Sequence, residues 1–141
     1  MKVLVDTSVW SLALRRKSEA LNAGERLIVA ELSELIGESR AAILGLVRQE
    51  LLSGVKTAEQ YEKLRAHLHA FDDEPVNRAD YEDAARFGNQ CRAKGIAVFA
   101  VDLLICAVAM KRGWAIFSTD PDFAAYARVL PIKLHQPRKS L

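Results

Sequence analysis

Four acidic residues occupy positions where a packed domain would not place them for solvation alone: Asp6, Glu50, Asp102 and Asp120. Carboxylates that meet in one place can act as acids, bases or ligands of a metal ion. Asp6 ends the apolar run Val-Leu-Val, and Asp102 interrupts the apolar run VFAVDLLICAVAM. What chemistry these acids can do depends on the elements that position them.

Each acid also fits a purely structural role. Asp6 precedes an expected helix, which it would cap by accepting backbone N–H bonds. Asp120 stands before Pro121, the pattern of a helix start, and Asp102 lies at the beginning of another expected helix. Glu50 shares a helical stripe with apolar residues, so its side chain points inward or along a cleft, or else lies on a rim and reaches water.

Short apolar runs alternate with longer segments of helical periodicity, which is typical of an α/β domain with a mostly parallel sheet. Strands are expected at residues 2–5, 41–44 and 115–118, and an edge strand that begins with proline at residues 131–134. Helices are expected at residues 8–16, 24–37, 46–54, 58–71, 78–95, 100–113 and 120–129.

This arrangement predicts that the four acids converge, because open α/β sheets bind ligands outside the carboxyl ends of their strands. Asp6 and Asp120 follow strands directly, Glu50 lies on the helix after the second strand, and Asp102 lies in the first turn of a deeply packed helix. At an effective dielectric of about 20, two unit charges about 4 Å apart repel each other by roughly 4 kcal/mol. Such a group protonates or binds a cation, and all-oxygen ligation favours Mg²⁺ or Mn²⁺.

The bulk properties indicate one globular domain. The chain has 141 residues, half of them hydrophobic, and a formal net charge of +2, which identifies no class of partner. Cys91 and Cys106 stand in separate helical segments and read as free thiols in the core, which favours the reducing cytoplasm. Asp6 interrupts the first apolar run and Asp102 the longest, so we expect neither a signal peptide nor a membrane span.

Four segments together resemble the PIN-domain ribonucleases and, in length and layout, the VapC toxins of VapBC toxin–antitoxin pairs: VDTSVW, QELLSG, VDLLICAVAMKRG and IFSTDPDF. The resemblance extends from about residue 2 to residue 134. It implies a three-layer α/β/α sandwich with a central, mostly parallel sheet. We therefore expect a PIN domain at residues 1–134 and a loose C-terminal tail at residues 135–141.

Carried over position by position, the resemblance implies a catalytic metal site of Asp6, Glu50, Asp102 and Asp120. Asp122 matches a further acid often seen in the last segment and is a secondary candidate. The hydroxyl residues that flank the acids are also secondary candidates, since they can hydrogen-bond a carboxylate or a metal-bound water: Thr7, Ser8 and Ser118.

The implied function is that of a toxin that hydrolyses RNA phosphodiesters with water activated by Mg²⁺ or Mn²⁺. This route needs no 2′-hydroxyl nucleophile, so the predicted ends are 5′-phosphate and 3′-hydroxyl. The implied partners are the RNA substrate, a cognate VapB-type antitoxin and a second copy of the chain in a homodimer.

Two basic segments, Arg15–Lys17 and Arg138 with Lys139, either meet RNA phosphates or are solvated charges, and the solvated reading is the commoner one. His67 and His69 point to different faces of a helix, which argues against zinc. Apolar surface for a dimer or an antitoxin is offered by Trp10, Leu12 and the helix after Thr57, unless these residues are ordinary core.

Two rival functions use the same acids. A phosphatase-type α/β hydrolase also places an acid after its first strand, but the haloacid-dehalogenase type needs a second Asp two residues later, where this chain has Ser8. A catalytically inert PIN-like binding module would keep the acids only for folding or for binding the antitoxin. It would bind that partner without metal and cleave no RNA.

Overall fold

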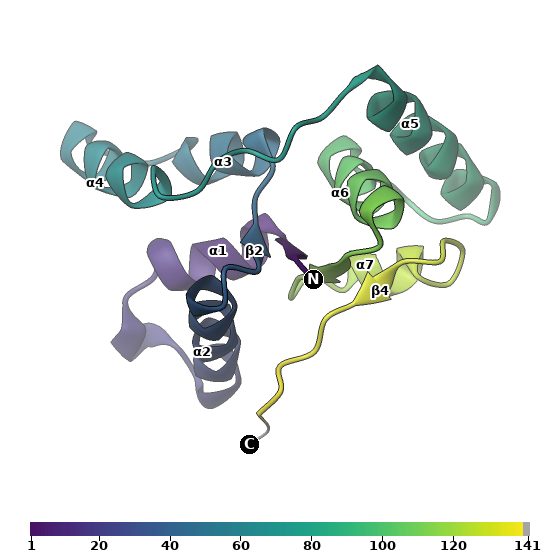
Figure 1. Cartoon of the computed structure of the whole chain (residues 1–141). Coiled ribbons are helices and arrows are strands. Elements are labelled where there is room, and N and C mark those ends of the chain that lie inside the picture. Colours follow the sequence, from purple (N-terminus) through teal and green to yellow (C-terminus); the bar gives the residue numbers. More distant parts are fainter. Residues whose placement is uncertain (140–141) are drawn as a thin grey trace.

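The computed structural model describes residues 1–139 and centres on one four-stranded sheet in which every pairing is parallel (Figure 1). The strand order is β2-β1-β3-β4, so β4 lies at an edge, as predicted. The strands are short: β1 Val3–Val5, β2 Ala41–Ala42, β3 Ala115–Phe117 and β4 Lys133–Leu134.

Helices connect these strands, because a parallel pair needs a long crossover between its members. Figure 1 shows α1 and α2 on one side of the molecule and α5 and α6 on the other, which agrees with the expected α/β/α sandwich. The helices are α1 Thr7–Leu14, the 3₁₀ turn η1 Ser18–Ala20, α2 Ala23–Gly37, α3 Gly45–Leu52, α4 Ala58–Leu68, α5 Arg78–Ala93, α6 Ala100–Arg112 and α7 Asp122–Tyr126.

Each predicted helix and strand exists, but several end earlier or begin later than expected. The helix expected at 58–71 ends at Leu68, and the helix expected at 120–129 is the single turn Asp122–Tyr126. One side chain binds the backbone twice where the longer α4 was expected: Arg48 Nη1 donates to the Leu68 carbonyl at 2.9 Å, and Arg48 Nη2 donates to that of Phe71. A side chain from α3 therefore caps the end of α4.

The core forms where α6 packs against β1 and β3. Residues 103–109 of α6 are all buried, and Gly113, in the left-handed conformation at φ 70°, ends this helix and turns the chain into β3. Trp10 and Leu12 are also core residues, exposed by 1% and 7%, so they offer no docking surface for a partner. Helix α4 likewise buries its leucines, Leu64 and Leu68. None of the helices in residues 1–139 has the length and apolar character that a membrane crossing requires.

The sheet topology fixes where a site can form. From the centre of the sheet, β1 leads to β2 on one side and β3 leads to β4 on the other, so the chain changes direction between β1 and β3. A crevice opens at such a switch point, outside the carboxyl ends of the strands. The residues that leave β1 and β3 there are Asp6 and Ser118.

The expectation of a loose tail is wrong for residues 135–139. The side chains of His135 and Arg138 reach Glu31 on α2 at 2.6 and 3.0 Å, and Arg138 also pairs with Glu38 at 2.8 Å. Glu31 is only 4% exposed, so a charge in the middle of α2 needs these partners. Residues 140–141 lie outside the described part, and a division of the chain at residue 134 stays a prediction.

We predict that Glu31→Gln destabilises the protein at neutral pH by about 1 kcal/mol, because charge-assisted hydrogen bonds to His135 and Arg138 are lost. Burial raises the pKa of Glu31, but the hydrogen bonds of His135 and Arg138 outweigh burial and lower the pKa below 4.5. The Glu31 carboxylate thus stabilises the fold above its unfolded pKa, and this contribution disappears as the pH falls through the lower folded value. Urea unfolding at several pH values should show the wild type and Glu31→Gln converging in acid, and a constant difference would contradict the ion pair.

Candidate metal centre

Three carboxylates meet at the switch point of the sheet. One oxygen from each lies within 4.8 Å of the others, and the three residues are Asp102 on α6, Asp120 after β3 and Asp122 at the start of α7. They line a hollow of about 370 Å³, together with Glu50 and residues 99–101. We call this hollow the acidic hollow.

Asp102 is the acid most affected by its surroundings. Burial raises its pKa, the charges of Asp6, Asp120 and Asp122 raise it further, and a hydrogen bond from Tyr126 works against them, with a result of about 6. The Tyr126 hydroxyl donates this bond to Asp102 Oδ2 at 2.8 Å and thereby fixes the carboxylate. The first turn of α6 also favours a negative charge through the helix dipole.

Asp6 does not line the hollow and is 5% exposed. Its Oδ2 accepts hydrogen bonds from the hydroxyls of Ser8 and Ser118, both at 2.8 Å, and from the Ser8 amide at 3.3 Å. Asp6 therefore caps α1, as the structural reading expected, and its charge also acts on Asp102. Asp6 is not one of the three acids whose oxygens lie within 4.8 Å of one another.

Ser118 links Asp6 to the other acids. While its hydroxyl donates to Asp6, the same oxygen accepts the backbone N–H of Asp120 at 3.0 Å. Asp120 Oδ1 in turn accepts the backbone N–H of Asp122 at 2.9 Å. These hydrogen bonds order the turn of residues 118–122 and keep Asp120 and Asp122 near each other.

Glu50 lies on the rim of the acidic hollow and is exposed, so its side chain follows the cleft and does not point into the core. Its Oε1 accepts a hydrogen bond from the Thr7 hydroxyl at 2.6 Å, which connects α3 to the first turn of α1. This contact leaves the second carboxylate oxygen of Glu50 available to water or a ligand.

The donor set fits a small hard cation. Three carboxylates crowd together, and the described residues supply no lysine or arginine to the lining of the hollow. Oxygen ligands with this charge are those that Mg²⁺ and Mn²⁺ take, and such an ion would relieve the repulsion among them.

The carboxylates that lie close together in the structure are not the same set that the sequence predicted as metal ligands. Asp122, expected as secondary, belongs to the close triad, whereas Asp6 is buried outside it and Glu50 lines the hollow from an exposed position. Tyr126 was missed altogether. The spacing of Asp122 and Tyr126, four residues apart in a short helix, is the signal that places both on one face.

We predict that Asp102→Asn stabilises the metal-free protein, and that the gain grows as the pH rises from the ordinary aspartate pKa of 3.8 to about 6 and then stays constant, because in this range the unfolded wild type has lost the proton that the folded protein still holds. Asparagine keeps an acceptor for the Tyr126 hydroxyl. Urea unfolding in EDTA at acidic and mildly alkaline pH measures the effect, and adding Mg²⁺ should stabilise the wild type but not the variant. A pH-independent difference would contradict the repulsion.

Comparisons with known proteins agree on the fold. Residues 3–129 match the PIN domain. A comparison with curated proteins gives no match. Among solved structures, a chain of the FitAcB structure from Neisseria gonorrhoeae superposes with a TM-score of 0.74 at 21% identity, covering 96% of this chain and 97% of that one.

Two further solved structures are similar over nearly their whole length. One is VapBC2 from Rickettsia felis bound to a DNA fragment from its promoter, with a TM-score of 0.71, 16% identity and coverage of 96% and 98%. The other is VapBC-5 from Mycobacterium tuberculosis, a member of the VapBC family of toxin–antitoxin systems, with a TM-score of 0.66, 22% identity and coverage of 96% and 98%. The family match spans most of the chain and agrees with the parallel sheet and the acidic hollow at its switch point, so this chain belongs to the PIN domain family.

Proposed function

We propose that this protein is a metal-dependent endoribonuclease and the toxin of a VapBC-type toxin–antitoxin pair. The observation that carries the proposal is the convergence of Asp102, Asp120 and Asp122 in a hollow that the exposed Glu50 also lines. Similarity to chains in toxin–antitoxin structures supports the toxin role. A protein of this kind acts on RNA in the cytoplasm, and we expect this protein to be located there.

In this proposal the close triad holds Mg²⁺ or Mn²⁺. When bound, such an ion lowers the pKa of a coordinated water and neutralises negative charge on a phosphoryl oxygen. Asp102 contributes a carboxylate that Tyr126 holds in place, and Asp120 and Asp122 contribute carboxylates that the hydrogen-bonded turn after β3 holds in place.

Asp6 and Glu50 complete the acid set in two different ways. Asp6 is the buried negative charge that fixes Ser8 and Ser118, and through Ser118 it positions the turn that carries Asp120. Glu50 has one oxygen held by Thr7 and lies at the opening, where it can orient water or a metal ligand. We therefore assign Glu50, Asp102, Asp120 and Asp122 to the reacting site and Asp6 to the positioning of its neighbours.

We predict that Asp120→Asn reduces Mg²⁺-dependent RNA cleavage by at least about a hundredfold, since a ligand charge is lost. Asp72→Asn is the matched control, because Asp72 is exposed and lies outside the hollow. The assay follows labelled RNA with purified protein and identifies the product ends, for which we expect 5′-phosphate and 3′-hydroxyl. Equal cleavage by Asp120→Asn and Asp72→Asn would overturn the assignment, and antitoxin binding without any cleavage by the wild type would favour the inert module.

Contacts with a second copy or with an antitoxin need exposed apolar surface. The sequence suggested Trp10, Leu12 and the helix after Thr57, but we infer a different surface. Tyr81 on α5 and Phe99 before α6 are 55% and 59% exposed, and they line a pocket of about 350 Å³ between α5 and α6. Phe99 also lines the acidic hollow, so the two hollows adjoin. Large exposed aromatic side chains of this kind are enriched at interfaces.

We predict that Tyr81→Glu weakens the homodimer, because it places a charge in this apolar pocket. Tyr61→Glu is the control, since Tyr61 is an exposed tyrosine on α4 that does not line the pocket. Light scattering after size-exclusion chromatography measures the mass. A dimeric Tyr81→Glu variant would place the contact elsewhere.

A further inference from the structure

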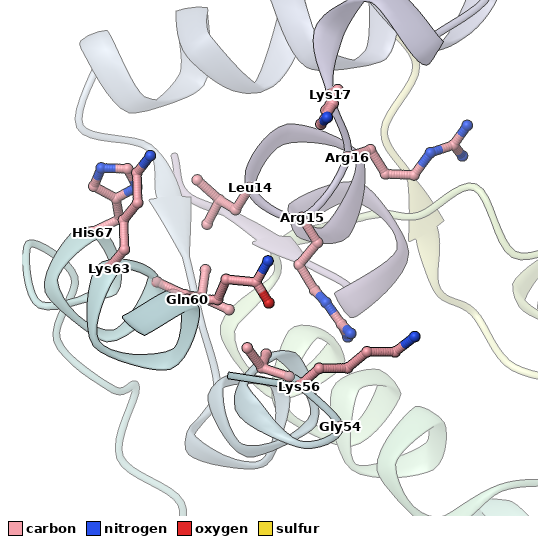
Figure 2. Close-up of a pocket in the computed structure, with 11 residues that line it drawn as sticks. Leu14, Arg15, Arg16, Lys17, Gly54, Lys56, Gln60, Lys63 and His67 are labelled. Atoms are coloured by element: carbon pink, nitrogen blue, oxygen red, sulfur yellow. The ribbon is translucent and has the colours of Figure 1, made fainter. Parts of the chain in front are cut away.

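A second pocket, of about 470 Å³, lies where the end of α1, the turn after α3 and helix α4 meet (Figure 2). We call it the basic pocket, because its lining contains cationic side chains and no carboxylate. The basic and polar lining residues are Arg15, Arg16, Lys17, Lys56, Gln60, Lys63 and His67. Only Leu14, Gly54, Val55 and Leu64 complete the lining.

Most of these cations have no internal counter-charge. Arg16 pairs with Glu25 at 3.3 Å, and Figure 2 shows its side chain extending away from that of Arg15. Within residues 1–139, Arg15, Lys17, Lys56 and Lys63 make no ion pair. Figure 2 shows the ends of Arg15 and Lys56 in the same region, between α1 and the turn after α3.

The other basic segment of the sequence behaves in the opposite way. Arg138 pairs with Glu31, Glu34 and Glu38, and Lys139 also pairs with Glu34. These tail cations therefore stabilise the fold through α2. The two basic segments, which the sequence could not tell apart, thus differ in whether their charges are already neutralised.

We propose that the basic pocket binds backbone phosphates of the RNA whose scissile phosphate lies in the acidic hollow. This inference rests on the proposed ribonuclease function, and it adds a binding subsite outside the acids. The same two helices lead to both places: α1 starts beside Asp6 and ends at the basic pocket, and α3 carries Glu50 shortly before Gly54 and Lys56.

The distance between the two places suits a single nucleic-acid strand. With a rise of about 1.5 Å per residue, α1 covers about 12 Å between Thr7 and Arg15. The six residues from Glu50 to Lys56 span at most about 20 Å. A strand of a few nucleotides bridges such a gap.

Electrostatics favours RNA over an acidic protein segment as the occupant. The acids of the hollow repel a polyanion, so a nucleic acid needs a favourable charge interaction elsewhere along the same strand. Unpaired cations a short distance from the hollow provide it. Phosphate contacts by Lys and Arg supply most of the sequence-independent affinity for nucleic acid. The lining of the basic pocket has no feature that is specific for a peptide.

The test measures RNA binding by a triple variant, Arg15→Gln with Lys56→Gln and Lys63→Gln. The matched control is Arg26→Gln with Lys94→Gln and Lys133→Gln, which removes the same charge from exposed residues outside the pocket. The probe is a fluorescein-labelled single-stranded oligoribonucleotide of mixed sequence, and its anisotropy is followed in EDTA so that no metal-dependent cleavage occurs.

We expect the triple variant to bind the RNA at least about tenfold more weakly than the control. The plot of log affinity against log salt should become shallower by about 2, since each lost phosphate contact on a single strand removes about 0.7 from the slope. Lys56→Arg with Lys63→Arg keeps the charges and should bind like the wild type. Circular dichroism melts confirm that each variant is folded.

Equal affinity and equal salt slope in the triple variant and the control would overturn the inference. Unchanged RNA binding, together with loss of polyglutamate binding in the triple variant, would also overturn it and assign the pocket to an acidic protein segment. Because binding is measured without metal, it is independent of catalysis: a wild type that binds RNA through this pocket but cleaves none in Mg²⁺ would reject the ribonuclease proposal and keep the phosphate subsite.

Discussion

Val5 pairs with Phe117 in the parallel ladder between β1 and β3, so the next residues, Asp6 and Ser118, leave the sheet side by side. The Ser118 hydroxyl then joins the buried Asp6 to the backbone of Asp120. The spacing among the acids depends on this register, because a shift by one residue would send the alternating side chains to opposite faces of the sheet. Buried strands with fully apolar side chains make such a shift costly, and this is how strands of only three residues hold a site in place.

The net charge of +2 conceals a strong separation of charge across the surface. Carboxylates gather in the acidic hollow, whose described lining has no lysine or arginine, and cations gather at the far end of α1, where only Arg16 among the described lining residues has a carboxylate partner. Other charges compensate each other, as in the contacts of Glu31 with His135 and Arg138. A polyanion that bears a metal-binding phosphate matches both regions at once, whereas the sum of the charges reveals neither.

Sequence patterns predicted the elements that are set by local rules: the apolar run of β1, the apolar helix α6 and the acid at a strand end. They were less informative wherever a partner lies far away in the chain. Glu31 meets His135 across 104 residues, so no local pattern showed that the tail is docked. Asp122 reaches the triad because a turn held by Ser118 brings it there. Lys56 and Lys63 line one pocket with Arg15 because α3 packs against both α1 and α4. The end of α4 was misjudged for the same reason, since Arg48 on α3 binds the carbonyls of Leu68 and Phe71.

The residues that form and support the acidic hollow lie far apart in the sequence, and this separation affects the order of folding. Asp6 and Ser118 are joined across 112 residues, so closing their contact requires most of the chain to be present and ordered. Contacts of this range form slowly compared with local helices. During synthesis, the early segment would expose Asp6 and Glu50 as isolated carboxylates with no counterpart from α6 or α7. The acidic hollow therefore forms only after the second half of the chain folds onto the first.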